Sequence, residues 1–447
     1  MVQQVEVEKR DSRYAAHVRR LQDRTESLLA NNGFDRLLIH SGRGRARFQD
    51  DYHPPFRAHP HFVAWLPLPR HADCLLEIRP GTRPTLWLNE PDDFWHAPPD
   101  KPESWWAERY EIETVQSAEG WQHALEEPVA TALIADPQDF ESLGRHAALN
   151  PSGLLRDLDE LRTVKSDFQI ACIAAANRTA VVGHRAAERA FRDGASELEI
   201  HLAYLQAAAH DPDRLPYGSI VGLNEHCAVL HYQNRDAKPP PVSRSFLIDA
   251  GADCYGYAAD ITRTWCRDDE TFSSLIEAVD EMQQRLTRRM QAGRSYVDLN
   301  AEAHRGVAEI LRSASLCDMS LDAMLEAGVT TTFLPHGLGH FLGVQVHDVA
   351  GRISPEGETL PPPDRHPALR LTRTLEADNV VTVEPGLYFI PSLLDRLEST
   401  PLSRHFDWQA IGHLRQFGGI RIEDDVVVRP ERPDNVTRAA WEAAGQD

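Results

Sequence analysis

The chain has few cysteines, no long apolar run and no excess of basic residues. Its six cysteines are spread over 447 residues without a C-x-x-C pair, a spacing that favours neither a structural zinc site nor a disulfide framework. No stretch approaches the roughly 18 uninterrupted apolar residues of a membrane span, and the polar start MVQQVEVEKRDSRY is unlike a secretory signal. Lys and Arg number 47 against 68 Asp and Glu, a formal charge of −21, which argues against nucleic-acid binding. We expect a soluble, cytoplasmic protein with no nucleic-acid or membrane partner.

The pattern of apolar and turn-forming residues predicts two domains. In the first part, a helical pattern at 12–33 ends at Gly33, and strands are expected at 35–42, 62–68, 73–80, 85–91 and 131–137. A mixture of this kind is typical of an α/β domain. A long helical stretch then begins near Leu158, and within it Ser166 and Gln169 have the spacing of a capping box. We place the domain boundary between residues 160 and 161.

In the second part, helices and strand pairs alternate. Helices are predicted at 197–210, 272–292, 298–313 and 321–327, and strands at 227–232, 246–251, 257–265, 380–389 and 419–428. The stretch 352–370, rich in proline and charge, is expected to be a surface loop.

Two aspartates flank the turn in FLIDAGADCYGYAAD (246–260). Asp249 ends an apolar run, and Asp260 follows eleven residues later. A strand, a turn with two glycines and a returning strand would form an antiparallel pair with both carboxylates on one face. Facing carboxylates resist ionisation together, and a divalent cation removes that conflict by binding both. For this pair alone, a turn aspartate and a surface aspartate remain the commoner explanation.

Histidines and glutamates at later strand ends strengthen the metal hypothesis. FLPHGLGHFLGVQVHD (333–348) carries His336, His340 and His347 among glycines. Glu384 ends a Val-rich run before a Pro-Gly turn, and Glu423 lies in GIRIEDDVVV, where alternation puts it on the face of Arg421. A surface glutamate and a plain Arg–Glu ion pair are the simpler explanations of the last two features. Taken together, four carboxylates and one imidazole suit two cations such as Mn²⁺, Co²⁺ or Zn²⁺.

From about Leu158 to Arg429, these segments resemble the pita-bread metallopeptidases, a family that includes methionine aminopeptidase, aminopeptidase P and prolidase. The resemblance implies an α+β chain with a pita-bread (creatinase/aminopeptidase) catalytic domain at 161–447 and an α/β creatinase-like (RNase H-like) domain at 1–160. FQDDYHPPFRAHPHFVAWLP (48–67) is similar to that N-terminal domain. The implied metal ligands are Asp249, Asp260, His340, Glu384 and Glu423, with His340 preferred to His336 because it precedes His347 by the family's seven residues.

Within the family, VLHYQN, IDAGADCYGYAADITRTW and PHGLGHFLGVQVHDV are most similar to the bacterial long prolidases. The likeness implies hydrolysis of Xaa-Pro dipeptides by a homodimer with two divalent ions per subunit, most often Mn²⁺, and a side activity on organophosphorus esters. It implies that Glu384 also moves the proton, that His231 and His347 stabilise the oxyanion, and that substrate contacts come from His336, Arg370, Arg421 and Tyr217.

Plainer roles stay open for three of these residues. Arg370, which matches the arginine that binds the substrate carboxylate, is otherwise a solvated loop residue. Arg421 would otherwise orient Glu423, and Tyr217 would otherwise be a core aromatic. Asp50 or Asp51 would reach the partner subunit's site and meet the substrate's amino group.

Three other family members give alternative functions. Aminopeptidase P acts on longer Xaa-Pro peptides. Non-catalytic pita-bread binding modules lose the metal ligands, and creatinase works without the full set. The complete set of five ligand types counts against the last two.

Overall fold

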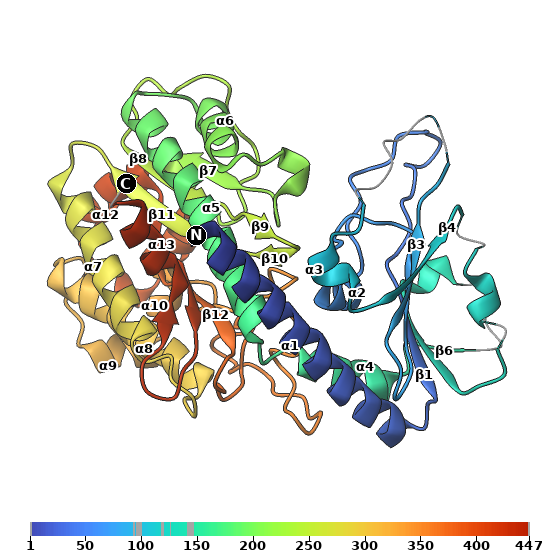
Figure 1. The fold of residues 1–447 in the computed structure, drawn as a ribbon. Helices are drawn as coiled ribbons and strands as arrows, with labels where there is room; N and C mark the ends of the chain where they lie inside the picture. Colours follow the sequence, from blue (N-terminus) through green and yellow to red (C-terminus); the bar gives the residue numbers. More distant parts are fainter. Residues whose placement is uncertain are drawn as a thin grey trace. The chain divides into compact units, whose positions relative to one another are not determined.

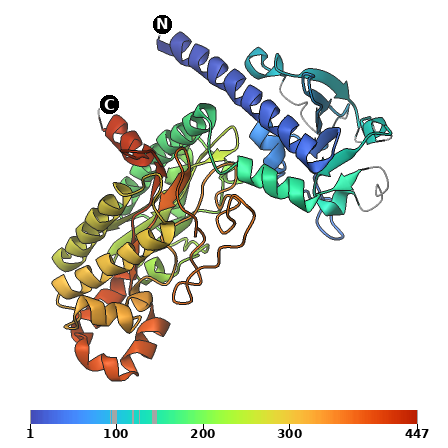
Figure 2. The ribbon, with the colours of Figure 1, turned by 90° about the horizontal axis from the view of Figure 1, so that it is seen from below.

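The computed structural model describes residues 2–92, 94, 101–117, 120–125, 127–140 and 147–445. Contacts within the chain divide it into two units, Met1–Gln169 and Ile170–Asp447. One six-stranded sheet lies in the first unit, and the other described strands form sheets of two or three strands in the second (Figure 1 and Figure 2). Among the described helices, none combines the length and the hydropathy that a bilayer-spanning segment requires.

The sheet of the first unit mixes parallel and antiparallel pairs. Its order is β4-β3-β2-β1-β5-β6, where β1 runs antiparallel to β2 and parallel to β5. β1, β2 and β5 are buried at every position, so both faces of the sheet are covered, as in other layered α/β structures. The strands are β1 Arg36–His40, β2 Leu75–Ile78, β3 Thr85–Asn89, β4 Glu111–Val115, β5 Thr131–Ile134 and β6 Ala148–Leu149.

Four helices accompany this sheet: α1 Val2–Asn32, α2 Pro60–Trp65, α3 Ser104–Ala107 and α4 Ser152–Leu161. The strand predicted at 62–68 is wrong, because most of that stretch is α2. Pro60 stands in the first turn of α2, where its missing N–H costs nothing, and the His59 side chain accepts the His61 amide as an N-cap. A uniformly buried apolar run of this length has no periodicity to separate helix from strand.

The second unit contains most of α5 (Asp167–Arg192), whose start up to Gln169 belongs to the first unit, and the capping box predicted at that start is confirmed. The Ser166 amide donates to Gln169 Oε1 at 2.9 Å, and the Gln169 backbone amide donates to Ser166 Oγ at 3.4 Å. The other helices of this unit are α6 Glu197–Ala208, α7 Glu270–Thr287, α8 Tyr296–Ser313, α9 Leu321–Glu326, α10 Thr330–Phe333, α11 Pro391–Glu398, α12 Trp408–Leu414 and α13 Val436–Ala444.

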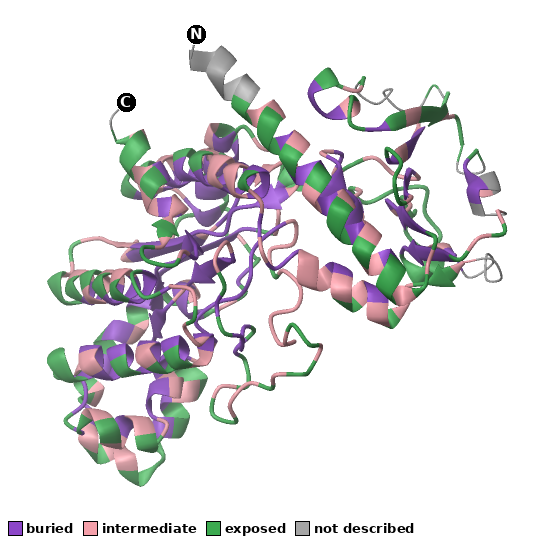
Figure 3. Ribbon diagram, turned by 60° about the horizontal axis from the view of Figure 1, so that its bottom comes forward, coloured by how far each residue is buried: buried purple, intermediate pink, exposed green. Residues whose placement is uncertain are grey.

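The strands of the second unit form small sheets at its centre. They are β7 Ile220–Leu223, β8 Ser245–Asp249, β9 Asp253–Cys254, β10 Tyr257–Ala258, β11 Thr262–Cys266, β12 Val380–Val383, β13 Gly386–Tyr388, β14 Gly419–Arg421, β15 Asp424–Val427 and β16 Asp434–Asn435. The sheet orders are β11-β8-β7, β12-β15-β16, β13-β14 and β10-β9. Figure 3 shows these strands almost wholly in the buried colour, whereas the helices present exposed faces. Apolar side chains of α7 and α8, such as Val279 and Val307, share one core with Val381 and Leu387 of the strands.

Three predicted strands are each interrupted in the structure, and the interruptions coincide with acidic residues. Residues 257–265 divide into β10 and β11 with Asp260 between them. Residues 380–389 divide into β12 and β13 around Glu384, and residues 419–428 divide into β14 and β15 around Glu423. β12 pairs with β15 and β13 pairs with β14. Residues 380–388 therefore keep one partner segment, residues 419–427, and one register, and the ladder lapses only between the pairs Val383–Asp424 and Gly386–Arg421. An acidic residue at such a gap leaves the regular ladder and can turn toward the space between the sheets.

The strand predicted at 227–232 is also wrong. Its first part belongs to a 3₁₀ turn, Asn224–Ala228, and the remainder is irregular. The turn begins at Asn224, which adopts a positive φ of 56°, a conformation that asparagine tolerates better than most residues.

Candidate metal centre

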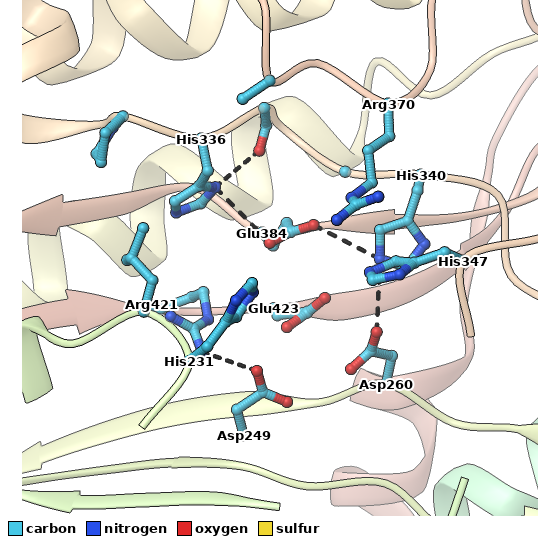
Figure 4. A pocket seen from close by; sticks show the side chains of 15 residues that line it. His231, Asp249, Asp260, His336, His340, His347, Arg370, Glu384, Arg421 and Glu423 are labelled. Atoms are coloured by element: carbon cyan, nitrogen blue, oxygen red, sulfur yellow. Dashed lines mark hydrogen bonds and ion pairs between the residues drawn. The ribbon is translucent and has the colours of Figure 1, made fainter. Parts of the chain in front are cut away.

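One cavity of the second unit collects nearly all the predicted site residues. It has a volume of about 290 Å³ and is lined by ten of them (Figure 4): His231, Asp249, Asp260, His336, His340, His347, Arg370, Glu384, Arg421 and Glu423. Tyr217 is not in this lining. Its ring lies against the turn after Asp249, where a Cβ added to Gly251 would come within 2.9 Å of Tyr217 Cε1.

The two aspartates come from the antiparallel pair β8 and β11. Asp249 is directly opposite Thr262, so Asp260, two residues before Thr262, is its diagonal neighbour on the same face. The connecting turn is tight at Gly251, because a Cβ there would lie only 2.0 Å from the carbonyl oxygen of Ala259. Glycine at 251 therefore allows the close approach that brings the two carboxylates together.

His340 is held by its backbone and by one ring nitrogen. Its amide donates to Thr382 Oγ1 at 3.1 Å, and its carbonyl accepts the Thr382 amide at 3.0 Å. The ring Nδ1 lies 2.9 Å from the carbonyl oxygen of Phe341. Since a carbonyl oxygen can only accept, Nδ1 carries the proton and Nε2 offers its lone pair to the cavity. Nε2 lies 3.5 Å from Asp260 Oδ2 and 3.7 Å from Glu384 Oε1.

Glu423 reaches the same point from the other side of the cavity. Its amide donates to the Thr262 carbonyl at 3.0 Å, and its Oε2 accepts the Thr262 hydroxyl at 2.7 Å. Three possible ligand atoms, one from each of Asp260, His340 and Glu423, lie within 4.8 Å of one another. All three side chains are almost fully buried.

The electrostatics of the cavity show an excess of negative charge. Burial raises the pKa of Asp249 and raises the pKa of Glu423 well above its usual range. Burial also raises the pKa of Glu384 to about 7. Burial opposes ionisation of Asp260 as well, but without an ion in the cavity Nε2 of His340 is protonated, and its hydrogen bond and charge outweigh burial and lower the pKa of Asp260. Burying four carboxylates beside one another is unfavourable unless a cation is shared among them.

Two buried polar atoms without a hydrogen-bond partner also indicate room for a cation in the cavity. Asp249 Oδ1 and the Tyr217 hydroxyl are both buried without a hydrogen bond of normal geometry to any described residue. Buried polar atoms of native proteins nearly always have a partner, so an orphaned carboxylate oxygen in a cavity is a place for a ligand or ion. The oxygen-rich donors with one imidazole nitrogen fit a hard or borderline divalent cation.

Tyr388 is a residue of this site that the sequence did not reveal. Arg421 Nη1 donates to the Tyr388 hydroxyl at 3.0 Å, and that hydroxyl is 2.8 Å from His336 Nε2. Arginine only donates, so the Tyr388 hydroxyl accepts from it. His336 Nδ1 lies 2.8 Å from the Gly337 carbonyl and therefore carries the ring proton, which leaves Nε2 to accept a hydrogen bond from the Tyr388 hydroxyl. The ring fits because Gly386 and Gly419 have no Cβ where it lies. Two glycines facing an aromatic residue on paired strands were the signal available.

Arg421 orients an aspartate rather than Glu423. Its Nη2 donates to Asp249 Oδ2 at 2.8 Å and its Nε donates to Thr262 Oγ1 at 3.1 Å. Arg421 and Glu423 do line the same cavity, as alternation predicts, but the hydrogen bonds of the guanidinium go to Asp249, Thr262 and Tyr388.

A buried support holds the peptide of Asp260. The Asp260 amide donates to Asp425 Oδ2 at 3.0 Å, and Asn177 Nδ2 donates to the same oxygen at 2.7 Å. Thr437 of α13 joins the network through its hydroxyl, which donates to Asn177 Oδ1 at 2.5 Å and accepts the Asp425 amide at 2.9 Å. The network ties α5 and α13 to the position of Asp260.

Four carboxylates and an imidazole around a cavity between short sheets define a divalent-metal hydrolase as the class of protein. Comparison with family models gives the same class. Residues 171–430 match the model of metallopeptidase family M24, and residues 12–159 match the model of the Xaa-Pro dipeptidase N-terminal domain.

Curated relatives and solved structures agree. A Xaa-Pro dipeptidase of Pectobacterium atrosepticum is 46% identical over 97% of this chain and 99% of its own length. One of Salmonella newport is 44% identical over 95% and 97%. The structure of Escherichia coli aminopeptidase P in its Zn-substituted, product-bound form superposes with a TM-score of 0.70 at 22% identity, covering 95% of both chains. Pseudomonas aeruginosa aminopeptidase PepP gives 0.71 at 20% identity, covering 98% and 99%.

The chain belongs to metallopeptidase family M24. The predicted resemblance and the predicted fold class, a pita-bread domain preceded by an α/β domain, are confirmed. Membership and the donor set together support a divalent metal cofactor.

Proposed function

We propose that this chain is a Xaa-Pro dipeptidase that binds two divalent ions, most readily Mn²⁺, and releases a free amino acid and proline. The proposal rests on one observation above all. Relatives named Xaa-Pro dipeptidase match almost the whole chain at 44–46% identity, and the five residues proposed as metal ligands line one cavity.

The residues proposed to hold the ions are Asp249, Asp260, His340, Glu384 and Glu423. When bound, the ions polarise the scissile carbonyl and make a water nucleophilic near neutral pH. Glu384 is the proposed proton carrier, because its carboxylate is partly exposed to the cavity. It would take a proton from the attacking water and deliver it to the leaving proline nitrogen.

The proline nitrogen explains why a dedicated site is needed. An Xaa-Pro bond is a tertiary amide without an N–H, so recognition cannot use that hydrogen bond. The leaving secondary amine must instead be protonated as the bond breaks, which Glu384 would do. His231 and His347 line the cavity and are proposed to donate hydrogen bonds to the carbonyl oxygen as negative charge develops there.

Substrate termini need charged partners of their own. Figure 4 shows Arg370 extending from its loop toward Glu384 and His340, and we assign it to the C-terminal carboxylate of the dipeptide, which a guanidinium can grip at two points. We also assign Arg421 and His336, which line the cavity, to substrate contacts. Tyr217 is assigned there too, from its position against the turn after Asp249. We assign residues 1–160 to the N-terminal domain and 161–447 to the catalytic domain, and we propose a homodimer in the cytoplasm.

The decisive experiment compares Leu-Pro with Leu-Pro-Gly as substrates. The purified full chain is dialysed against a chelator and then reloaded with Mn²⁺, Co²⁺ or Zn²⁺. We expect chelation to remove Leu-Pro hydrolysis, Mn²⁺ to restore most of it, and the tripeptide to be the poorer substrate. Faster cleavage of the tripeptide would instead identify an aminopeptidase P, and a protein that binds none of these ions would be a non-catalytic module.

A further inference from the structure

A second group of metal-like side chains lies outside the cavity, near the start of α6. Glu197, His226 and Asp236 place one ligand atom each within 4.8 Å of one another. Glu197 is the first residue of α6 and is 1% exposed. A buried carboxylate beside a histidine would suit a metal, so the group needs an explanation.

Hydrogen bonds already saturate the Glu197 carboxylate. Oε1 accepts the Leu223 amide at 2.9 Å and lies 2.7 Å from His226 Nδ1. Oε2 accepts the Tyr232 hydroxyl at 2.9 Å and the Asp236 amide at 2.9 Å. With two donors on each oxygen, all four lone-pair positions of the carboxylate are in use. The group is therefore closed around the protein's own donors and is not a metal site.

The four donors all come from one segment, residues 223–236, which also contributes to the active cavity. Leu230 and His231 of this segment line the cavity, and the segment has almost no regular structure beyond its 3₁₀ turn. His226 stacks on Tyr232 with ring centroids 4.4 Å apart. Glu197 thus holds the segment on both sides of His231, through Leu223 and His226 before it and through Tyr232 and Asp236 after it.

We infer that Glu197 is the positioning residue for His231, and that its four hydrogen bonds fix where the imidazole stands in the active cavity. The inference rests on the proposed function, because it assigns the effect of Glu197 to an oxyanion-stabilising His231. Other bonds hold the ends of the segment, from Asn224 to Val242 and Arg244 and from Arg235 to Ser219, but Glu197 bonds the segment on both sides of His231. A displacement of about 1 Å at a reacting group costs on the order of a hundredfold in rate.

Glu197→Gln tests this assignment with a minimal change of shape. In the Gln variant, a nitrogen that can only donate would replace Oε2. It would then face the Tyr232 hydroxyl and the Asp236 amide, the two groups that donate to Oε2 in the unchanged protein. The Tyr232 hydroxyl can rotate to accept it, but the Asp236 amide cannot, and that tie is lost. We expect kcat/KM for Leu-Pro to fall about tenfold, mostly in kcat, with Mn²⁺ affinity unchanged because none of the proposed metal ligands lies in the segment.

Glu199→Gln is the matched control. Glu199 lies in the same first turn of α6 and is exposed. Its Oε2 accepts hydrogen bonds from the Ser196 amide and the Ser196 hydroxyl, each at 2.8 Å. The substitution removes the same charge from the same helix end without touching residues 223–236. We expect its kcat/KM to equal that of the unchanged protein.

A double-mutant cycle with His231→Ala separates positioning from a loss of stability. If Glu197 acts through His231, then Glu197→Gln should have no further effect on kcat/KM in the His231→Ala background. An undiminished tenfold loss there, or an unchanged kcat/KM in the single variant, overturns the inference. Failure of the unchanged protein to cleave Leu-Pro would overturn the proposed function instead, so the two failures are distinguishable.

Discussion

Buried charges are arranged differently in the two units of the chain. In the first unit, Arg36 is fully buried and bonds Glu77 at 3.0 Å and Glu127 at 3.1 Å, and Arg79 bonds the same two glutamates. Each carboxylate there has guanidinium partners. In the second unit, the cavity holds four carboxylates, and Arg421 bonds one of them. A cluster in which every carboxylate has a guanidinium partner, a matched cluster, stabilises the fold. A cluster in which carboxylates outnumber guanidinium groups can bind a cation.

Asp424 and Glu423, two consecutive residues, show the same contrast. Asp424 is completely buried and bonds Arg263 at 2.5 Å and Arg438 at 2.8 Å. Burial alone would raise the pKa of Asp424, but the two guanidinium groups outweigh it and hold that pKa at about 2. Its neighbour Glu423 accepts a threonine hydroxyl instead, and the pKa of Glu423 is raised. Burial of a carboxylate is therefore not by itself the signal of a metal ligand. Nor is a missing counter-charge, because Asp425 is fully buried beside two amide donors and no guanidinium group. What distinguishes the proposed ligands is that four carboxylates share one cavity.

The largest effect is expected from Asp260→Asn. The change keeps the size of the side chain but removes the charge that His340 and the ions share, so Mn²⁺ affinity and Leu-Pro hydrolysis should both fall by about a thousandfold or more. Calorimetric Mn²⁺ titration and a proline-release assay measure the two losses. Asp253→Asn, in the same connection between β8 and β11, should keep both, and a fully active Asp260→Asn protein would contradict the metal assignment.

Arg36→Met should break the matched cluster of the first unit. Removing one partner of a buried ion pair leaves Glu77 less well compensated, so we expect the free energy of unfolding to fall by about 3 kcal/mol. Denaturant unfolding followed by circular dichroism gives the loss. Mn²⁺ affinity should stay within twofold of the unchanged protein, and a large loss of that affinity would show that the two clusters are not independent.

Adding Mn²⁺ should stabilise the protein, because the ion binds the native cavity and not the unfolded chain. At a hundred times Kd, the stabilisation is about 2.7 kcal/mol, visible as a rise in Tm by calorimetry. The rise should persist in Arg36→Met and disappear in Asp260→Asn. A rise of the same size in Asp260→Asn would place the ion elsewhere.

A smaller effect is expected from Asn177→Ala. The change removes one donor to Asp425 and loosens the peptide of Asp260, without altering a proposed ligand. Outer partners of metal ligands change affinity by about tenfold or somewhat more, so we expect a tenfold loss of Mn²⁺ affinity. Val307→Ala, a core substitution in α8, is the control for general destabilisation, and an equal loss of affinity in that variant would remove the support for a specific role.

Much of the site could be predicted from spacing. Asp249 and Asp260 flank a turn with glycines, and an antiparallel pair must then bring them together. Glu384 stands before Pro385, which has no N–H to donate to a sheet, so a gap in the strand could be expected beside it. These are local consequences of chain geometry, and the structure places all three residues around one cavity.

The interruption of the strand at Glu423 could not be predicted in this way. Residues 419–428 alternate and contain no Pro or Gly after Gly419, yet the strand stops before Glu423. At that point Glu423 bonds Thr262 instead of a residue of the paired segment, through its amide at 3.0 Å and its carboxylate at 2.7 Å, and a partner so far away in the sequence cannot be read from the local pattern. Tyr388, Asn177 and Glu197 escaped notice for the same reason, because each acts through partners more than 25 residues away.

The amino-acid sequence by itself determined the ligand types, their order and the turns beside them, since these follow from side-chain chemistry and from glycine and proline at fixed positions. Only the tertiary structure decided which oxygen atoms face one another, that Arg421 serves Asp249, and that Glu197 binds its own loop rather than a metal. Those choices depend on which distant strands pair, and the free energy of burying them together decides that pairing.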